Sequence, residues 1–112
     1  MQVTLEFQLN HENFIDIIDT ACYGAIEYWA EEVEYAAGKL SISCEEGAEV
    51  HEIEMPDMEK AIAKIMEGKV SISDSIRADV TSAIKEDDYG YIDSYAADAI
   101  VQIACFGEIV YG

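Results

Sequence analysis

Apolar and polar residues alternate at the start of the chain and then change to a helical spacing. Single polar residues separate Val3, Leu5, Phe7 and Leu9, which is the period of a half-buried strand. From residue 11 to about residue 30 the apolar positions recur every three or four residues, and this spacing predicts an amphipathic helix. Glycine inside such a helix costs about 1 kcal/mol relative to alanine, so we expect another element to pack closely against Gly24.

The period of two returns in the middle of the chain, and the breaks in it suit hairpin turns. The alternation predicts three short strands, at residues 32–36, 39–44 and 49–55. Proline cannot donate to a strand ladder, so Pro56 ends the third strand.

Two helices are predicted after this strand. Asp57 is expected to cap the first helix, which ends at Gly68. The second helix begins at Ser73 or Asp74 and ends at Lys85.

The last twenty residues form the longest apolar segment of the chain and contain no Lys or Arg. Asp93 caps a final helix that Gly107 ends, and residues 108–111 follow as a short terminal strand. The pattern therefore predicts one α+β domain over residues 1–112. Its small, mainly antiparallel sheet has about four or five strands, and about four helices pack on one face of the sheet.

The acidic charge limits which classes of partner the protein is expected to bind. The chain has 24 acidic and 6 basic residues, which gives a formal net charge of −18. Residues 1–38 hold eight acids and residues 45–59 hold seven, and neither stretch contains a Lys or Arg. Such a surface repels nucleic acid and anionic membranes and attracts basic protein surfaces.

Residue types exclude several other functions. Without a spanning apolar run or a basic leader, the protein is expected to be soluble and intracellular. Cys22, Cys44 and Cys105 are expected to be buried thiols that act as small hydrophobes and form no disulfide framework. His11 and His51 have no ligand partners at metal-binding spacing, and no nucleophile motif is present, so we predict no metal, no cofactor and no catalytic activity.

Two local features leave alternatives open. The acidic turn at residues 85–93, which includes Asp87–Asp93, lacks the first and last ligands of a calcium loop, so a helix-capping turn is favoured over a cation site. Arg77, the single arginine, either pairs with an acid such as Asp74 or Asp79 or binds a phosphate in a pocket. In the second interpretation Trp29 and Tyr111 belong to the same ligand site.

Short motifs in Phe14–Glu31 and Ile92–Gly112 add a resemblance. These motifs are Tyr28-Trp29, Ile92-Asp93, Ala97-Asp98, Val101-Gln102 and the closing segment from Phe106 to Gly112. On them the chain resembles a family of small, largely uncharacterised accessory proteins of tailed bacteriophages. The resemblance covers about a third of the chain, without its acidic middle. It implies a phage origin and action in the cytoplasm of the infected bacterium, and it transfers no catalytic residue.

Charge and resemblance together predict a binding protein. In the first hypothesis the acidic surface mimics nucleic acid and blocks the basic nucleic-acid-binding channel of a host defence complex, such as a CRISPR effector or restriction enzyme. In the second, an oligomer sequesters a nucleotide immune signal, and in the third a non-catalytic phage adaptor binds a basic host protein. The first predicts no direct binding to nucleic acid or membrane. Its contact residues are Glu27, Glu31, Glu32, Glu34, Glu45, Glu46, Glu49, Glu52 and Glu54.

Overall fold

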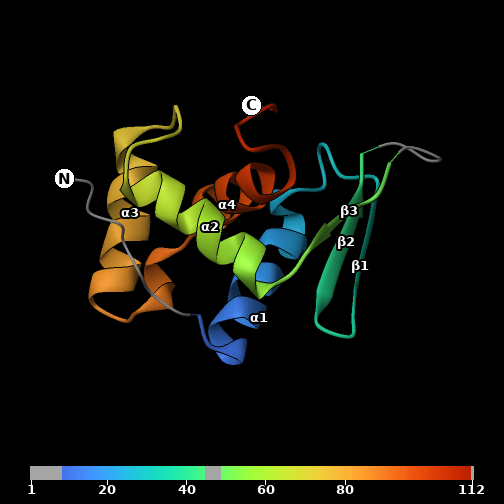
Figure 1. Cartoon of the computed structure of the whole chain (residues 1–112), viewed down its shortest axis with the longest axis horizontal. Coiled ribbons are helices and arrows are strands. Elements are labelled where there is room, and N and C mark those ends of the chain that lie inside the picture. The colour runs from blue at the N-terminus through green and yellow to red at the C-terminus, as the bar shows by residue number, and fades with distance from the viewer. Residues whose placement is uncertain (1–8, 45–48, 112) are drawn as a thin grey trace.

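The computed structural model describes residues 9–44 and 49–111 as an α+β fold with a three-stranded sheet at one end (Figure 1). The α-helices are α1 (His11–Thr20), α2 (Met55–Met66), α3 (Asp74–Lys85) and α4 (Ser94–Phe106). A π-helical turn, η1 (Ala21–Ala25), follows α1, and a 3-10 turn, η2 (Tyr89–Tyr91), precedes α4. The strands are β1 (Glu32–Ala36), β2 (Lys39–Ser43) and β3 (His51–Ile53).

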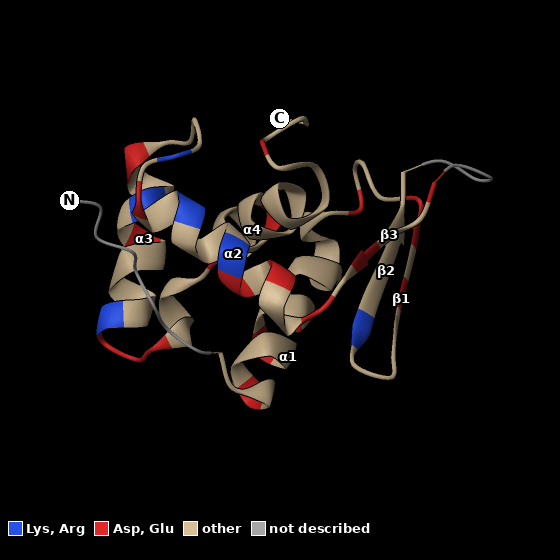
Figure 2. Ribbon diagram, viewed as in Figure 1, with Lys and Arg blue, Asp and Glu red and all other residues tan. Residues whose placement is uncertain are grey.

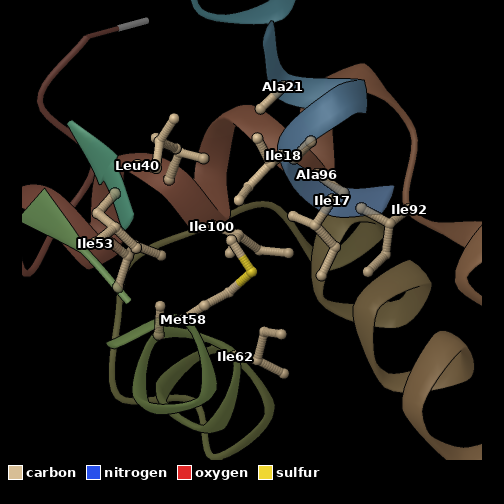
Figure 3. Packing of buried hydrophobic residues seen from close by; sticks show 14 of the residues in the cluster. Ile17, Ile18, Ala21, Leu40, Ile53, Met58, Ile62, Ile92, Ala96 and Ile100 are labelled. Atoms are coloured by element: carbon tan, nitrogen blue, oxygen red, sulfur yellow. The ribbon is translucent and has the colours of Figure 1, made fainter. Parts of the chain in front are cut away.

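Helix α4 lies at the centre and contacts α1, α2, α3, η1 and β3. Alanines at positions 96, 97 and 99 are buried, and such small side chains let neighbouring elements come close. In Figure 3, side chains from α1, the sheet and α2 converge around Ile100, which is fully buried. The buried face of α4 is therefore central to the core, as the composition of the closing segment predicts, whereas Val110 and Tyr111 at the end of that segment are exposed.

The first helix is shorter than its apolar spacing predicts. The side chain of Asn10 accepts a hydrogen bond from the backbone N–H of Asn13 at 2.7 Å and caps α1, which ends at Thr20. The chain then turns through η1, where Gly24 has a φ of +95°. The expected close packing at Gly24 is wrong, because a Cβ there would meet nothing within 4 Å. Glycine is favoured because L residues rarely adopt this backbone conformation.

The three central strands are confirmed and pair antiparallel in the order β1-β2-β3. The third is shorter than predicted, because it ends at Ile53 and Met55 already belongs to α2. Leu40, Ile42 and Ile53 are fully buried, which places one side of β2 and β3 against the helices. Ala37 and Gly38 join β1 to β2 with φ values of 54° and 78°, the positive values that a tight hairpin of matching twist requires.

Two further predicted strands have different outcomes. The first, residues 2–9, lies outside the described residues except for Leu9, which is buried. The second, residues 108–111, is not a strand. Its backbone N–H groups at Val110 and Tyr111 donate to the side-chain oxygen of Gln102, at 2.9 and 2.8 Å. A side chain thus replaces the neighbouring strand, and the described sheet has three strands instead of four or five.

The start of α2 also differs from the prediction. Glu54, and not Asp57, is the N-cap residue, and Pro56 lies inside the first turn. Asp57 instead accepts the backbone N–H of Glu54 at 2.9 Å, which is the return bond of a capping box. Proline is tolerated here because its missing N–H would have no intrahelical acceptor.

The predicted burial of the cysteines is only partly right, because all three thiols are free and half-buried. Burial, with a smaller effect of the neighbouring Cys44, raises the pKa of the Cys105 thiol to about 12. None of the helices formed by residues 9–44 and 49–111 has the length and apolar character that crossing a membrane requires.

Candidate functional site

Most of the described acidic residues singled out from the sequence lie in the strands or next to them. All seven that lie among the described residues are exposed: Glu27, Glu31, Glu32, Glu34, Glu49, Glu52 and Glu54. Glu45 and Glu46 lie outside the described residues. Every strand residue of β1 is exposed, so the first strand presents its glutamates at an open edge of the described sheet.

Strand register places some of these carboxylates on one face. Ser41 pairs with Glu34 on one side and with Glu52 on the other, so the three residues form a row across the sheet. Adjacent strands are about 4.8 Å apart, which separates the backbones of Glu34 and Glu52 by about 10 Å. Glu32 shares a face with Glu34 about 7 Å along the strand. We call Glu32, Glu34 and Glu52 the acidic sheet face.

One base enters this region through tertiary structure. The ammonium group of Lys39 lies 3.6 Å from a carboxylate oxygen of Glu52 and 3.7 Å from one of Glu54. Both pairs are exposed, so each contributes at most about 1 kcal/mol. No described Lys or Arg forms an ion pair with Glu32 or Glu34. The negative charge of β1 is therefore left to solvent.

The remaining bases lie elsewhere. Residues 1–59 contain 15 acids and a single base, Lys39, whereas residues 60–112 contain nine acids and five bases. Figure 2 shows these later bases on and around α2 and α3, away from the sheet. The acids of residues 9–59 do not form one cluster, however, because Asp16 and Asp19 of α1 line a shallow pocket with Asp87 and Asp88.

Arg77 is used within the scaffold. Its guanidinium donates to the backbone oxygens of Ile65 at 3.1 Å and Val70 at 3.2 Å. It also lies 3.3 Å from a carboxylate oxygen of Asp74, the pairing that was one of the two alternatives. These bonds connect the end of α2 to the start of α3.

The predicted ligand residues Trp29 and Tyr111 meet in a cluster of aromatic rings. Their rings stack with a centroid distance of 5.5 Å and an interplanar angle of 3°. Phe106 packs edge-on against both rings, and His51 of β3 packs edge-on against Phe106. Trp29 is only 5% exposed, so its ring is part of the core.

A hydrogen-bond network lies beside these rings and was missed by sequence reasoning. Asp98 accepts bonds from the Tyr28 hydroxyl at 2.6 Å, the indole N–H of Trp29 at 2.8 Å and the amide of Gln102 at 3.0 Å. Gln102 is buried and also donates to the backbone oxygen of Tyr111 at 2.9 Å. Desolvation of the hydroxyl, followed by the bond to Asp98 and its charge, raises the pKa of Tyr28 to about 12, although more than half of the residue is exposed. The hydroxyl thus stays protonated at neutral pH.

This network forms one wall of a cavity of about 660 Å³. Tyr95, Asp98 and Gln102 line it from α4, where they are three and four residues apart and so share one helix face. The sequence could have indicated this polar face, because a carboxylate and a glutamine lie four residues apart among the alanines of an otherwise apolar helix. Four of the five motifs behind the phage resemblance meet in the same place, because hydrogen bonds and ring contacts join Tyr28, Trp29, Asp98, Gln102, Phe106 and Tyr111.

The acidic turn after α3 is a capping structure. The side chain of Asp93 accepts the backbone N–H of Ala96 at 2.9 Å and caps α4, as predicted. Asp88 accepts the N–H of Gly90 at 3.0 Å. Within residues 9–44 and 49–111, no group of three His, Cys, Asp or Glu side chains could hold a metal ion.

Comparison with known proteins yields no relative: no protein-family model, no curated protein and no solved structure matches the chain. The similarity to phage accessory proteins therefore stays a prediction. Two candidate sites follow from the structure itself: the acidic sheet face and the cavity beside Asp98.

Proposed function

We propose that this protein is a phage-encoded inhibitor that binds stoichiometrically to a host defence complex in the cytoplasm of the infected bacterium. Its acidic sheet face takes the place of nucleic acid in a basic channel, such as that of a CRISPR effector or restriction enzyme. The observation that carries the proposal is the open β1 edge, where Glu32 and Glu34 are exposed and form no ion pair with a described base.

The amount of charge supports mimicry. The molecule measures 43 × 27 × 25 Å, and a DNA duplex 43 Å long carries about 25 phosphate charges. A net charge of −18 on a body of this length is roughly seven tenths of that value. A basic channel that concentrates phosphates would attract the chain by the same long-range field.

Sequestration of a nucleotide signal receives less support from the geometry. Arg77, the proposed phosphate clamp, bonds two backbone oxygens and Asp74 and does not line the cavity beside Tyr111. The adaptor hypothesis uses the same acidic surface as mimicry. It differs only in whether the partner's nucleic-acid site is occupied, so competition with nucleic acid separates the two.

The test compares two double charge reversals that change the net charge equally. Glu32→Lys/Glu34→Lys alters the β1 edge, whereas Glu86→Lys/Glu108→Lys alters two exposed acids outside the sheet. Partners are captured from bacterial lysate on the immobilised parent protein at low salt, and each is then bound to a fluorescent duplex or guide RNA. Fluorescence anisotropy measures how well each variant displaces that nucleic acid.

We expect the parent to displace the nucleic acid and to lose affinity steeply as salt rises from 50 to 200 mM, in the manner of phosphate contacts. Reversal on β1 should weaken displacement at least about tenfold, since each fully desolvated charge contact contributes about 1.5 kcal/mol or more. The control reversal should change it less than about threefold, as rim charges do. Equal losses in both variants, or salt-independent affinity, would contradict mimicry by the sheet. Binding without displacement would favour the adaptor.

A further inference from the structure

The cavity beside α4 has the size of a small-molecule site. Its walls come from η1 and the residues that follow it, the α2–α3 connection, the first turn of α3, helix α4 and the segment that follows α4. Its volume of about 660 Å³ falls within the range of about 300–1,000 Å³ that small-molecule pockets occupy. Apolar residues such as Ile72, Ile76 and Ala99 supply much of the lining, so a bound molecule would be partly shielded from water.

The carboxylate of Asp98 is the one charged group among the described residues that line the cavity. Trp29 and Gln102 donate to one carboxylate oxygen and Tyr28 donates to the other. All three donors are neutral, so the negative charge is solvated but not balanced. An ionised carboxylate has about four lone-pair positions, which leaves room for a further donor from a ligand.

The residues around Asp98 favour a positively charged ligand. None of the described residues that line the cavity is Lys, Arg or His. An unbalanced carboxylate between low-dielectric walls, in a chain of net charge −18, concentrates cations and repels anions.

Aromatic rings favour the same kind of ligand. Tyr95 lines the cavity with a side chain that is 77% exposed, and Tyr28 lines it with 57% exposure. The face of a tyrosine ring attracts an ammonium or guanidinium group placed over it. An exposed aromatic ring next to an apolar cavity leaves apolar surface in contact with water. A cationic ligand placed over the ring would cover that surface.

We infer that this cavity binds a small organic cation, with its ammonium or guanidinium group between the carboxylate of Asp98 and the ring of Tyr95. The volume suits a whole small molecule better than a single protein side chain. Ligand binding here is independent of the acidic sheet face, so either assignment can fail without the other.

Isothermal titration calorimetry with spermidine at physiological salt tests the inference, because such salt screens attraction to distant surface acids. Two matched pairs of variants locate the site. Asp98→Asn removes the cavity charge, and Glu108→Gln removes an exposed charge that does not line the cavity. Tyr95→Ala removes the lining ring, and Tyr23→Ala removes a ring that is 91% exposed and outside the cavity lining.

We expect one spermidine site. Asp98→Asn should weaken it tenfold or more, which is about the loss of one hydrogen bond to a charged group. Tyr95→Ala should weaken spermidine binding about two- to fivefold. If Asp98→Asn does not fold, the comparison of Tyr95→Ala with Tyr23→Ala tests the inference. The Glu108 and Tyr23 controls should bind as the parent does. Equal losses within either pair would show diffuse attraction and overturn the inference, as would binding of cyclic di-AMP in place of spermidine.

Discussion

Gln102 connects the C-terminal segment to the core, and its replacement by leucine tests that role directly. The side chain is 1% exposed and takes part in five hydrogen bonds. Its oxygen accepts the N–H groups of Val110 and Tyr111, and its amide donates to the Tyr111 backbone, Asp98 and the Tyr28 hydroxyl. Leucine has a similar size but can form none of these bonds.

The expected loss of stability follows from these bonds. A typical intramolecular hydrogen bond contributes about 0.5–1.5 kcal/mol net, and the amide has two hydrogens for three acceptors, so about four bonds count fully. The freed segment can bond to water, which reduces the loss. We therefore expect Gln102→Leu to lower the free energy of unfolding by about 2–4 kcal/mol. The melting temperature should fall by roughly 10 °C or more in a domain of this size.

Urea denaturation followed by tryptophan fluorescence measures the effect, because Trp29 is the only tryptophan and stacks on Tyr111. The control is the same substitution in a chain that lacks residues 108–112. Without that segment the buried amide loses three of its partners, so leucine should be neutral or stabilising there. A loss below about 1 kcal/mol in the full chain, or an equal loss in both backgrounds, would refute the proposed role of Gln102.

Two other predictions concern Tyr28 and Gly24. The pKa of Tyr28 is raised from 10.0 to about 12, so the stability it contributes is complete below pH 10 and is lost as pH rises through about 12. The stability difference between the parent and Tyr28→Phe should thus shrink over this window in pH-dependent urea melts, and a constant difference would contradict the assignment. Gly24→Ala should cost about 1–3 kcal/mol through backbone strain, since φ is +95° and a Cβ would contact nothing. Gly24→Asn should cost less, because asparagine tolerates positive φ; equal stability of all three proteins would show that η1 is not strained.

Helix ends and strands were largely readable from the sequence because short-range physics determines them. Helix α4 begins after Asp93, whose side chain bonds a backbone N–H three residues ahead, and ends before Gly107, whose φ is +80°. The three central strands follow from alternation over a few residues each. The excess of acids in the first half of the chain was also evident, and it predicts an acidic surface in any fold that keeps them exposed.

The candidate cavity was not readable in this way, because its parts are far apart along the chain. The bond from Trp29 to Asp98 joins residues 69 positions apart, and no local period records it. Tertiary structure likewise brought Lys39 to Glu52 and Glu54, and turned residues 108–111 from an expected strand into a segment bonded to Gln102.

By itself, then, the sequence determined the short-range elements and the sign of the charge, since caps, turns and periodicity act within a few residues. Only the tertiary structure decided which acids form the acidic sheet face and which line a cavity. The physical reason is that these arrangements depend on packing around α4. Its contacts with α1, α2, α3, η1 and β3 bring together residues that the linear pattern leaves separate.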